Sequence, residues 1–168
     1  LTTVSGPFNI NGLTKLTIEN YARFYSVKGL DYIVVRPANA YGVGQLPYRG
    51  QGFISNAIAS IMDNKNVVVF GEKGTVRDYI YVSDIARGIF AALAKGHSGE
   101  TYNIGSGIGM TNHDLLLRVK PMLEEDGYEV MIQYLPERVF DVRRNILASS
   151  KLTAHTGWKP AISLDDGL

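Results

Sequence analysis

The sequence has no cysteine among its 168 residues, and this absence removes several kinds of chemistry. Disulfide bonds, thiolate nucleophiles and cysteine-ligated metal sites are all excluded. The three histidines, His97, His113 and His155, stand apart in the sequence with no carboxylate or histidine at the spacing of a ligand set. We therefore interpret all three as surface residues and expect no metal site.

The sequence also lacks a large excess of positive or negative charge, and it lacks long apolar runs. The chain carries 17 Lys and Arg against 16 Asp and Glu, a formal net charge of +1, and the signs alternate, so a nucleic-acid partner is not expected. No apolar run approaches the roughly 20 residues that cross a bilayer, so no membrane role is expected. Residues 1–5 have neither the basic nor the apolar region of a signal peptide, which favours a cytoplasmic location.

Helical and extended patterns alternate along the chain, and this alternation predicts an α/β fold. Pro37 is expected to stop the first strand, and Pro121 to kink or end the fourth helix. The predicted helices cover 13–28, 52–64, 83–95, 111–123 and 150–156, and the predicted strands cover 31–36, 66–70, 78–82, 101–104 and 130–135.

The predicted strand over 31–36 is a continuous apolar run, which is typical of a parallel strand covered on both faces. No other strand of comparable length and apolarity is present to pair with it. At the other end, 163–168 has the pattern of a capped first turn of a helix. We therefore expect a fragment that is truncated at both ends.

The segment from Phe70 to Ala86 closely resembles a signature of the sugar-nucleotide epimerases and dehydratases, R-D-F/Y-I/V-Y/H-V-x-D-I/V/L-A. These enzymes are extended short-chain dehydrogenase/reductases. Four more segments are similar to the same family in the same order, at 12–15, 36–42, 102–107 and 157–160. Because five collinear segments cover nearly the whole chain, the resemblance is far more specific than any one of them.

The resemblance implies the last part of a Rossmann doubly wound parallel sheet plus the smaller mixed α/β substrate-binding domain. Residues 1–50 would be a remnant of the cofactor domain, and 51–168 mainly the sugar-nucleotide-binding region, with some segments returning to the Rossmann domain. The implied cofactor is NAD or NADP, bound by the complete protein and not by the fragment alone, because nothing in the chain resembles the glycine loop. The implied partners are a nucleotide sugar, UDP-linked, and a second copy in a homodimer.

In this family a tyrosine four residues before a lysine is the acid/base, and the lysine binds the nicotinamide ribose and lowers the pKa of the tyrosine. Lys15 matches the lysine, but Asn11 stands at the catalytic tyrosine position. An amide does not ionise in the useful range. Three explanations stay open: an engineered mutant, a natural member that binds without turnover, or a different acid/base. The bland alternative for Lys15 is a solvated helix charge paired with Glu19.

The resemblance assigns further residues to the cofactor and the substrate. Pro37 is expected beside the cofactor with Lys15. Arg77 and Arg138 match arginines that bind the diphosphate, a task that suits the planar guanidinium fork, and their alternative is a surface ion pair. Asn39 resembles an asparagine that donates to the phosphates, and its alternative is a turn residue beside Gly42.

Two hydrophobic residues, Val69 and Phe70, fall where family members line the nucleotide base with a short strand, and a core role is equally compatible with their spacing. Arg143 and Arg144 have no counterpart and are expected to be solvated. Asp78 is expected to be structural, through a pair with Arg77 within its loop, and Asp84 to be a charge at a helix N-terminus and not a catalyst.

The resemblance thus implies the C-terminal part of an NAD(P)-dependent nucleotide-sugar epimerase or dehydratase that acts through a transient keto sugar. Asn11 favours an alternative from another class, a non-catalytic sugar-nucleotide-binding protein of the same fold. A third hypothesis is an isolated α/β fragment without activity. Turnover would separate the first hypothesis from the second, and nucleotide-sugar binding would separate both from the third.

Overall fold

The computed structural model of the protein describes residues 10–139 and 141–168. Residues 1–5, which were read for a signal peptide, lie outside the described residues. The helices are α1 (Ile10–Ser26), α2 (Phe53–Met62), α3 (Val82–Lys95), α4 (Asn112–Glu125), α5 (Ser150–Thr156) and α6 (Leu164–Gly167). The strands are β1 (Val34–Pro37), β2 (Asn39–Tyr41), β3 (Val67–Phe70), β4 (Val76–Tyr81), β5 (Thr101–Ile104), β6 (Gly109–Thr111), β7 (Ile132–Leu135) and β8 (Arg144–Asn145).

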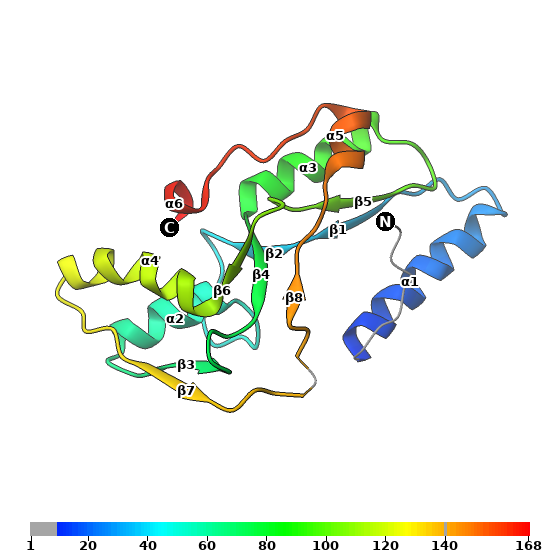
Figure 1. The fold of residues 1–168 in the computed structure, drawn as a ribbon. Coiled ribbons are helices and arrows are strands. Elements are labelled where there is room, and N and C mark those ends of the chain that lie inside the picture. The colour runs from blue at the N-terminus through cyan, green and yellow to red at the C-terminus, as the bar shows by residue number, and fades with distance from the viewer. Residues whose placement is uncertain (1–9, 140) are drawn as a thin grey trace.

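The predicted α/β fold is confirmed, and most strand pairs are parallel (Figure 1). β1 pairs with β5, β2 with β4, and β3 with β7, all in parallel. At its beginning β4 also pairs with β6, antiparallel, and with β8, parallel. β4 is therefore paired with three other strands, more than any other strand in the described residues. The boundary expected at residue 50 stays a prediction.

The expectation that the first apolar strand has no partner is wrong in part. Val34 pairs with Thr101 and Pro37 with Ile104, so β5 is its neighbour on one side. The strand expected over 101–104 is this neighbour, and its four residues alternate between buried and half-buried, unlike the continuous apolar run expected of a partner. Within the described residues no strand pairs with the other edge of β1.

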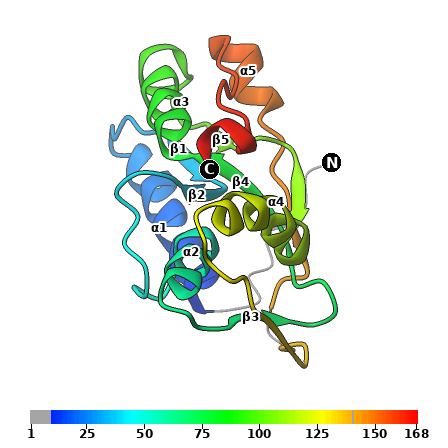
Figure 2. The same ribbon diagram turned by 90° about the vertical axis from the view of Figure 1, so that its left-hand side faces the viewer.

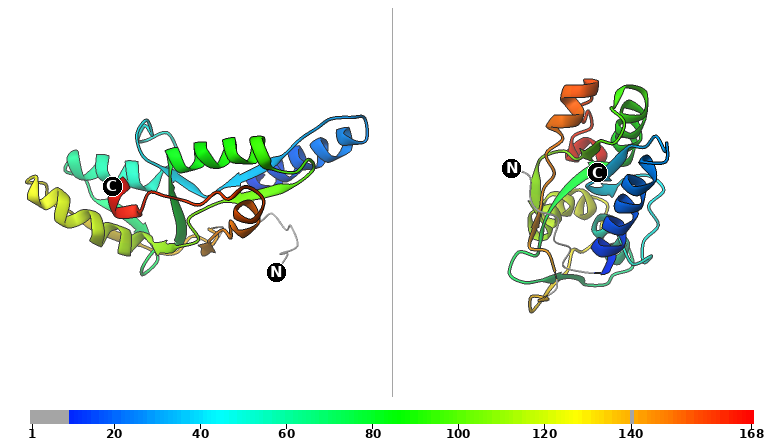
Figure 3. Two further views of the ribbon diagram at one scale, coloured as in Figure 1. Left: turned by 90° about the horizontal axis from the view of Figure 1, so that it is seen from above. Right: turned by 90° about the vertical axis from the view of Figure 1, so that its right-hand side faces the viewer.

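Two groups of helices cover the strands (Figures 1 and 2). α3 and α5 pack on one side of β1 and β5, where Tyr102, Ile104 and Leu152 are fully buried. α2 and α4 pack against β3 and β7 around Ile61 and Leu116. The view from above shows these two groups at different places along an elongated molecule (Figure 3).

α1 lies apart from both groups and buries none of its residues. Its large apolar side chains, Leu13, Ile18, Tyr21 and Phe24, are each about half exposed or more. The helix has an amphipathic sequence, yet the described residues offer nothing that covers its apolar face. No described helix is both long and apolar enough to cross a membrane.

The fourth helix does not end at Pro121, contrary to one of the two predicted outcomes. α4 continues to Glu125, and Thr111 caps its start by accepting a 2.9 Å hydrogen bond from the Asp114 N–H, as expected. A proline removes the hydrogen bond to the carbonyl four residues earlier. That carbonyl belongs to Leu117, an exposed residue, so we infer that water can satisfy it.

Asp78 does not pair with Arg77, contrary to expectation. Neighbouring strand residues point to opposite faces, and the fully buried Asp78 faces the core. It accepts hydrogen bonds from the Ser106 N–H (2.9 Å) and hydroxyl (2.5 Å), and from the N–H groups of Gly107 (3.0 Å) and Leu147 (3.2 Å). The side chain is therefore structural, and it ties β4 to the turn after β5 and to the segment before α5.

The prediction that Asp84 is a charge at a helix N-terminus is confirmed, since it lies in the first turn of α3. Asp84 also makes contacts outside this helix. Its carboxylate is fully buried and pairs with Arg87. It also accepts from the N–H groups of Ala161 (3.1 Å) and Ile162 (2.9 Å). Asp84 thus fixes the segment that leads to α6.

Asp78→Asn should lower the free energy of unfolding by about 2–4 kcal/mol, because an amide has one accepting oxygen for four donors and adds a donor of its own. The measurement is the urea midpoint and slope of the variant. Asp126→Asn, at the exposed end of α4, is the matched control and should change stability by less than about 0.5 kcal/mol. Equal stability of the two variants would contradict a structural role for Asp78.

Candidate functional site

Two adjoining cavities lie between α1, β2, β4 and the segment after β7. The larger, called here the central cavity, has a volume of about 850 Å³, and the smaller, the side cavity, about 200 Å³. The two share Asn39, Phe53, Arg77, Tyr79 and Arg138 as wall residues. They therefore form one continuous site.

The structure brings the sequence-predicted site residues together, although they come from six separate segments. The central cavity is lined by Lys15, Pro37, Asn39, Arg77 and Arg138, and the side cavity by Asn39, Val69, Phe70, Arg77 and Arg138. Only Asn11 lines neither cavity, and it lies one turn before Lys15 in α1. The individual roles of these residues stay predictions.

Arg77 is a half-buried cation without a carboxylate partner among the described residues. It donates two hydrogen bonds from Nη1, to the carbonyls of Val76 (2.9 Å) and Val142 (2.7 Å). Burial lowers the pKa of Arg77 from its usual value. The alternative that Arg77 serves a surface ion pair is thus not supported, and the side chain retains donors for an anionic ligand.

Arg138 does take part in an ion pair, so the alternative role given above, a surface ion pair, applies to it in part. Its Nε and Nη2 each lie 2.9 Å from Asp141 Oδ2. The guanidinium carbon also lies 4.0 Å from the centroid of the Phe70 ring, a stacked cation–π contact. Arg138 therefore stands between the aromatic wall of the side cavity and the central cavity, while Arg143 is 85% exposed.

Lys15 is not paired with Glu19, so the alternative role of a helix charge neutralised by Glu19 does not apply. Both oxygens of Glu19 are occupied by Arg36, whose Nε donates to Oε1 (2.7 Å) and whose Nη2 donates to Oε2 (2.5 Å). This hydrogen bonding raises the pKa of Arg36. Lys15 has no ion pair within the described part of the chain, so its ammonium group can meet a ligand in the central cavity.

Asn39 and the two apolar residues are placed by strand geometry. Asn39 is the first residue of β2 and is exposed, so the alternative of a turn residue beside Gly42 is wrong. Val69 is 1% exposed and packs in the core with α2 and α4. Phe70 alternates with it and is half-buried at the cavity wall. The core alternative thus applies to Val69 more than to Phe70.

Two wall residues were not expected from the sequence: Tyr79, which lines both cavities, and Asn112, which lines the side cavity. The hydroxyl of Tyr79 accepts from Asn112 Nδ2 (3.3 Å), and Asn112 Oδ1 accepts from the N–H (2.8 Å) and hydroxyl (3.0 Å) of Thr75. Burial raises the pKa of Tyr79 to about 12. The sequence could have indicated Tyr79 as a wall residue, because it lies two residues beyond Arg77 and therefore on the same face of the predicted strand.

The sequence suggested that the three histidines stand apart, but two of them are in contact in the structure. The rings of His97 and His155 stack with centroids 4.2 Å apart, and His155 Nδ1 lies 2.8 Å from the hydroxyl of Tyr102. His113 meets Tyr134 instead. Within the described residues no three metal-ligating side chains gather at one place.

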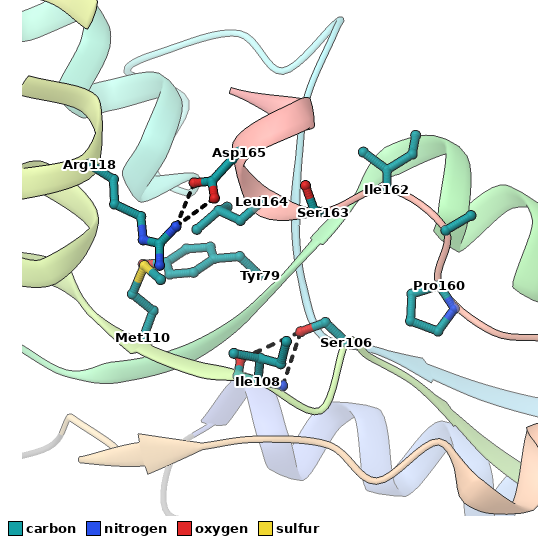
Figure 4. Close-up of a pocket in the computed structure, with 11 residues that line it drawn as sticks. Tyr79, Ser106, Ile108, Met110, Arg118, Pro160, Ile162, Ser163, Leu164 and Asp165 are labelled. Carbon is teal, nitrogen blue, oxygen red and sulfur yellow. Dashed lines mark hydrogen bonds and ion pairs between the residues drawn. The ribbon is translucent and has the colours of Figure 1, made fainter. Parts of the chain in front are cut away.

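A further cavity of about 420 Å³ lies beside the ring of Tyr79 and contains none of the sequence-predicted site residues (Figure 4). Arg118 and Asp165 face each other across it, with Arg118 Nη1 2.6 and 2.7 Å from the two carboxylate oxygens. Because its charged groups satisfy each other, we place the candidate site in the central and side cavities.

The chain is similar to known proteins over most of its length. Residues 2–105 match the profile described as "NAD dependent epimerase/dehydratase family". The structure of a UDP-glucose 4-epimerase from Thermotoga maritima, solved with UDP-glucose, is 37% identical, covers 93% of this chain and 50% of that chain, and has a TM-score of 0.84.

Two dTDP-glucose 4,6-dehydratases are also similar. The one from Streptomyces griseus is 35% identical over 83% of this chain and 41% of its own length. DesIV from Streptomyces venezuelae, solved with NAD and TYD bound, is 27% identical over 99% of this chain and 50% of that chain, with a TM-score of 0.87. The chain thus spans about half the length of these relatives.

Glu19→Gln should loosen α1, because the pair of Glu19 with Arg36 is a polar contact between this helix and β1. For a partly exposed pair we expect a loss of about 1 kcal/mol, or roughly fivefold faster amide exchange in residues 10–26. Hydrogen–deuterium exchange read by mass spectrometry measures it. Arg23→Gln, on an exposed position of the same helix, should leave the exchange unchanged. Unchanged exchange in Glu19→Gln would show that other contacts hold α1.

Proposed function

The chain belongs to the NAD dependent epimerase/dehydratase family, and from this premise we propose that it is the nucleotide-sugar-binding half of an NAD(P)-dependent epimerase or dehydratase. The observation that supports this most directly is the pair of cavities with cationic side chains between them. A nucleotide diphosphate sugar needs a slot for a base, cations for two phosphates and a wider space for a sugar. The side cavity, Arg77 with Arg138, and the central cavity supply them in that order.

The phosphates would lie where the two cavities meet. Arg77 and Arg138 each carry a planar fork of donors, which suits bidentate contact with phosphate oxygens. Asn39 is exposed at the same place and adds an amide donor. Arg138 would then exchange part of its contact with Asp141 for the ligand.

The base would occupy the side cavity against Phe70. A volume of about 200 Å³ suits a single pyrimidine ring. The relatives include both a UDP-glucose 4-epimerase and dTDP-glucose 4,6-dehydratases, and we propose a UDP-linked substrate because the Thermotoga epimerase has the higher identity.

The cofactor would reach the central cavity from the side of Lys15 and Pro37. When bound, a nicotinamide cofactor supplies a hydride acceptor for oxidation of the sugar to a keto sugar. The residues present fit that role, since Lys15 has no ion pair among the described residues and faces the cavity beside β1. Lys15 would hold the nicotinamide ribose and lower the pKa of a neighbouring proton donor.

Asn11 supports a second candidate function, that of a sugar-nucleotide-binding protein without turnover. Asn11 cannot ionise in the useful range. Among the described residues, Tyr79 is the one phenol that lines the central cavity, and a pKa of about 12 makes it a poor base near neutral pH. The half of an epimerase or dehydratase stays the first proposal, and the binding role without turnover is the second candidate because of Asn11.

We extend the proposal to a homodimer in the cytoplasm. The apolar side chains exposed on α1, such as Tyr21 and Phe24, support a partner for this helix.

Arg138→Ala and Arg77→Ala should each weaken the binding of UDP-glucose to the full-length protein by roughly 10- to 150-fold. A charge-assisted hydrogen bond contributes about 1.5–3 kcal/mol, and each arginine is expected to lose at least one. Isothermal titration calorimetry measures the dissociation constants. Arg143→Ala, at a side chain that is 85% exposed, is the matched control and should change binding little. Equal losses in all three variants would mean that general positive charge binds the ligand.

Asn11→Tyr should raise turnover of a UDP-sugar by the full-length protein by at least about 100-fold. A general acid/base group contributes about 10²- to 10⁴-fold, and a phenol here would lie one helical turn from the cation of Lys15. The measurement is product formation from UDP-sugars, with reduced-cofactor absorbance to detect a stalled keto sugar. Asn11→Phe is the control without a hydroxyl. Ordinary turnover in the parent, or a variant that binds substrate but is no faster, would contradict an acid/base site at position 11.

A further inference from the structure

One wall of the central cavity is built by the loop over 42–52, which connects β2 to α2 (Figure 2). Gln45, Gly50, Gln51 and Gly52 of this loop line the cavity. Because Lys15 and Pro37 line the same cavity, a change in the conformation of this loop would change the shape of the space that they border.

The loop has an unusual backbone that must be held in place. Gly42, Gly44, Gly50 and Gly52 all have positive φ values, and Tyr48 has φ 58°. A left-handed conformation is unfavourable for a non-glycine residue, so contacts elsewhere must compensate at Tyr48.

Tyr48 makes those contacts at both ends of α2. Its N–H donates to Asn56 Oδ1 (2.6 Å), and its hydroxyl donates to Asp63 Oδ2 (3.1 Å) and lies 3.4 Å from Ser60 Oγ. Lys65 completes the arrangement, 2.9 Å from the same Asp63 oxygen and 5.7 Å from the centroid of the Tyr48 ring. One side chain thus ties the middle of the loop along the length of the helix.

A second contact closes the base of the loop. Gln45 Nε2 donates to the carbonyl of Ala40 (3.0 Å), and the Gln45 side chain packs so closely on Gly52 that a Cβ there would lie 2.7 Å from Gln45 Cδ. Gln45 fixes the two ends of the loop to each other, while Tyr48 fixes its middle to α2. The hydroxyl of Tyr48 can be removed without touching any residue that lines the cavities.

We propose that Tyr48 is a positioning residue that holds the 42–52 loop as the sugar-contacting wall of the central cavity. The inference rests on the proposed function, which puts the base in the side cavity and the diphosphate at Arg77 and Arg138. The sugar must then lie between the diphosphate and Lys15, beside Gln45 and Gly50 to Gly52. A change in the loop therefore alters recognition of the sugar and leaves recognition of UDP intact.

The test compares UDP-glucose with UDP in the full-length protein and its Tyr48→Phe variant. Loss of the hydroxyl removes the bonds to Asp63 and Ser60 and keeps the backbone bond to Asn56. We expect the dissociation constant for UDP-glucose to rise about 3- to 10-fold and that for UDP to change less than about twofold. Amide exchange in residues 42–52 should become faster. General structural damage would weaken the binding of UDP as well as that of UDP-glucose, so an unchanged dissociation constant for UDP separates the two causes.

Matched variants separate the tether from side effects. Tyr134→Phe removes another hydroxyl with a hydrogen-bond partner, His113, away from both cavities, and should change neither affinity. Asp63→Asn keeps an accepting oxygen and should bind UDP-glucose like the parent, whereas Asp63→Leu should repeat the Tyr48→Phe result. The double variant Tyr48→Phe/Asp63→Leu should be no worse than either single variant, because both remove the same contact.

The outcomes distinguish the two proposals. A parent protein that binds neither UDP nor UDP-glucose overturns the proposed function and this inference with it. A parent that binds both overturns only this inference if Tyr48→Phe leaves UDP-glucose affinity and loop exchange unchanged. Equal weakening of UDP and UDP-glucose also overturns it, because the effect would then not be specific to the sugar.

Discussion

The buried carboxylate of Asp78 is the constraint on which the candidate site depends. Its four hydrogen bonds hold β4 against the turn after β5 and the segment before α5. Because side chains alternate along a strand, fixing Asp78 toward the core directs Arg77 and Tyr79 to the other face. Those two residues line both cavities, so one buried anion orients the cation that faces the ligand.

The charges around the site divide into those that are neutralised and those that remain available. Arg36 forms an ion pair with Glu19, and Arg118 forms one with Asp165, so the charges of both arginines are neutralised within the protein. Arg77 and Lys15 have no carboxylate partner within the described residues. A cavity with unpaired cations at partly buried positions attracts an anion with phosphate geometry. The proposed ligand class rests on this distribution of charges and not on the net charge of +1.

The walls of the site differ in how firmly they are held. The β4 wall is fixed by buried hydrogen bonds to Asp78 and through Asn112, whereas the 42–52 wall depends on exposed contacts made by Tyr48. α1, which carries Lys15 and Asn11, buries no residue and is joined to β1 through the Glu19–Arg36 pair. Parts held by few buried contacts open at lower free energy. The side proposed to hold the phosphates is therefore more rigid than the sides proposed to meet the sugar and the cofactor.

The sequence by itself determined the α/β class and most helices, because periodicity is a local property. The resemblance of its collinear motifs to a known family predicted the candidate site residues, and the structure brings Lys15, Pro37, Asn39, Val69, Phe70, Arg77 and Arg138 together in the walls of two adjoining cavities. The sequence did not determine the partner of β1, the acceptor role of Asp78 or the pairing of Glu19 with Arg36. Each of these joins residues far apart in the chain, as Asp78 and Leu147 show, or depends on which face of a strand a side chain takes. Only the tertiary structure decided them, because burial and long-range hydrogen bonding are fixed by packing and not by neighbours in sequence.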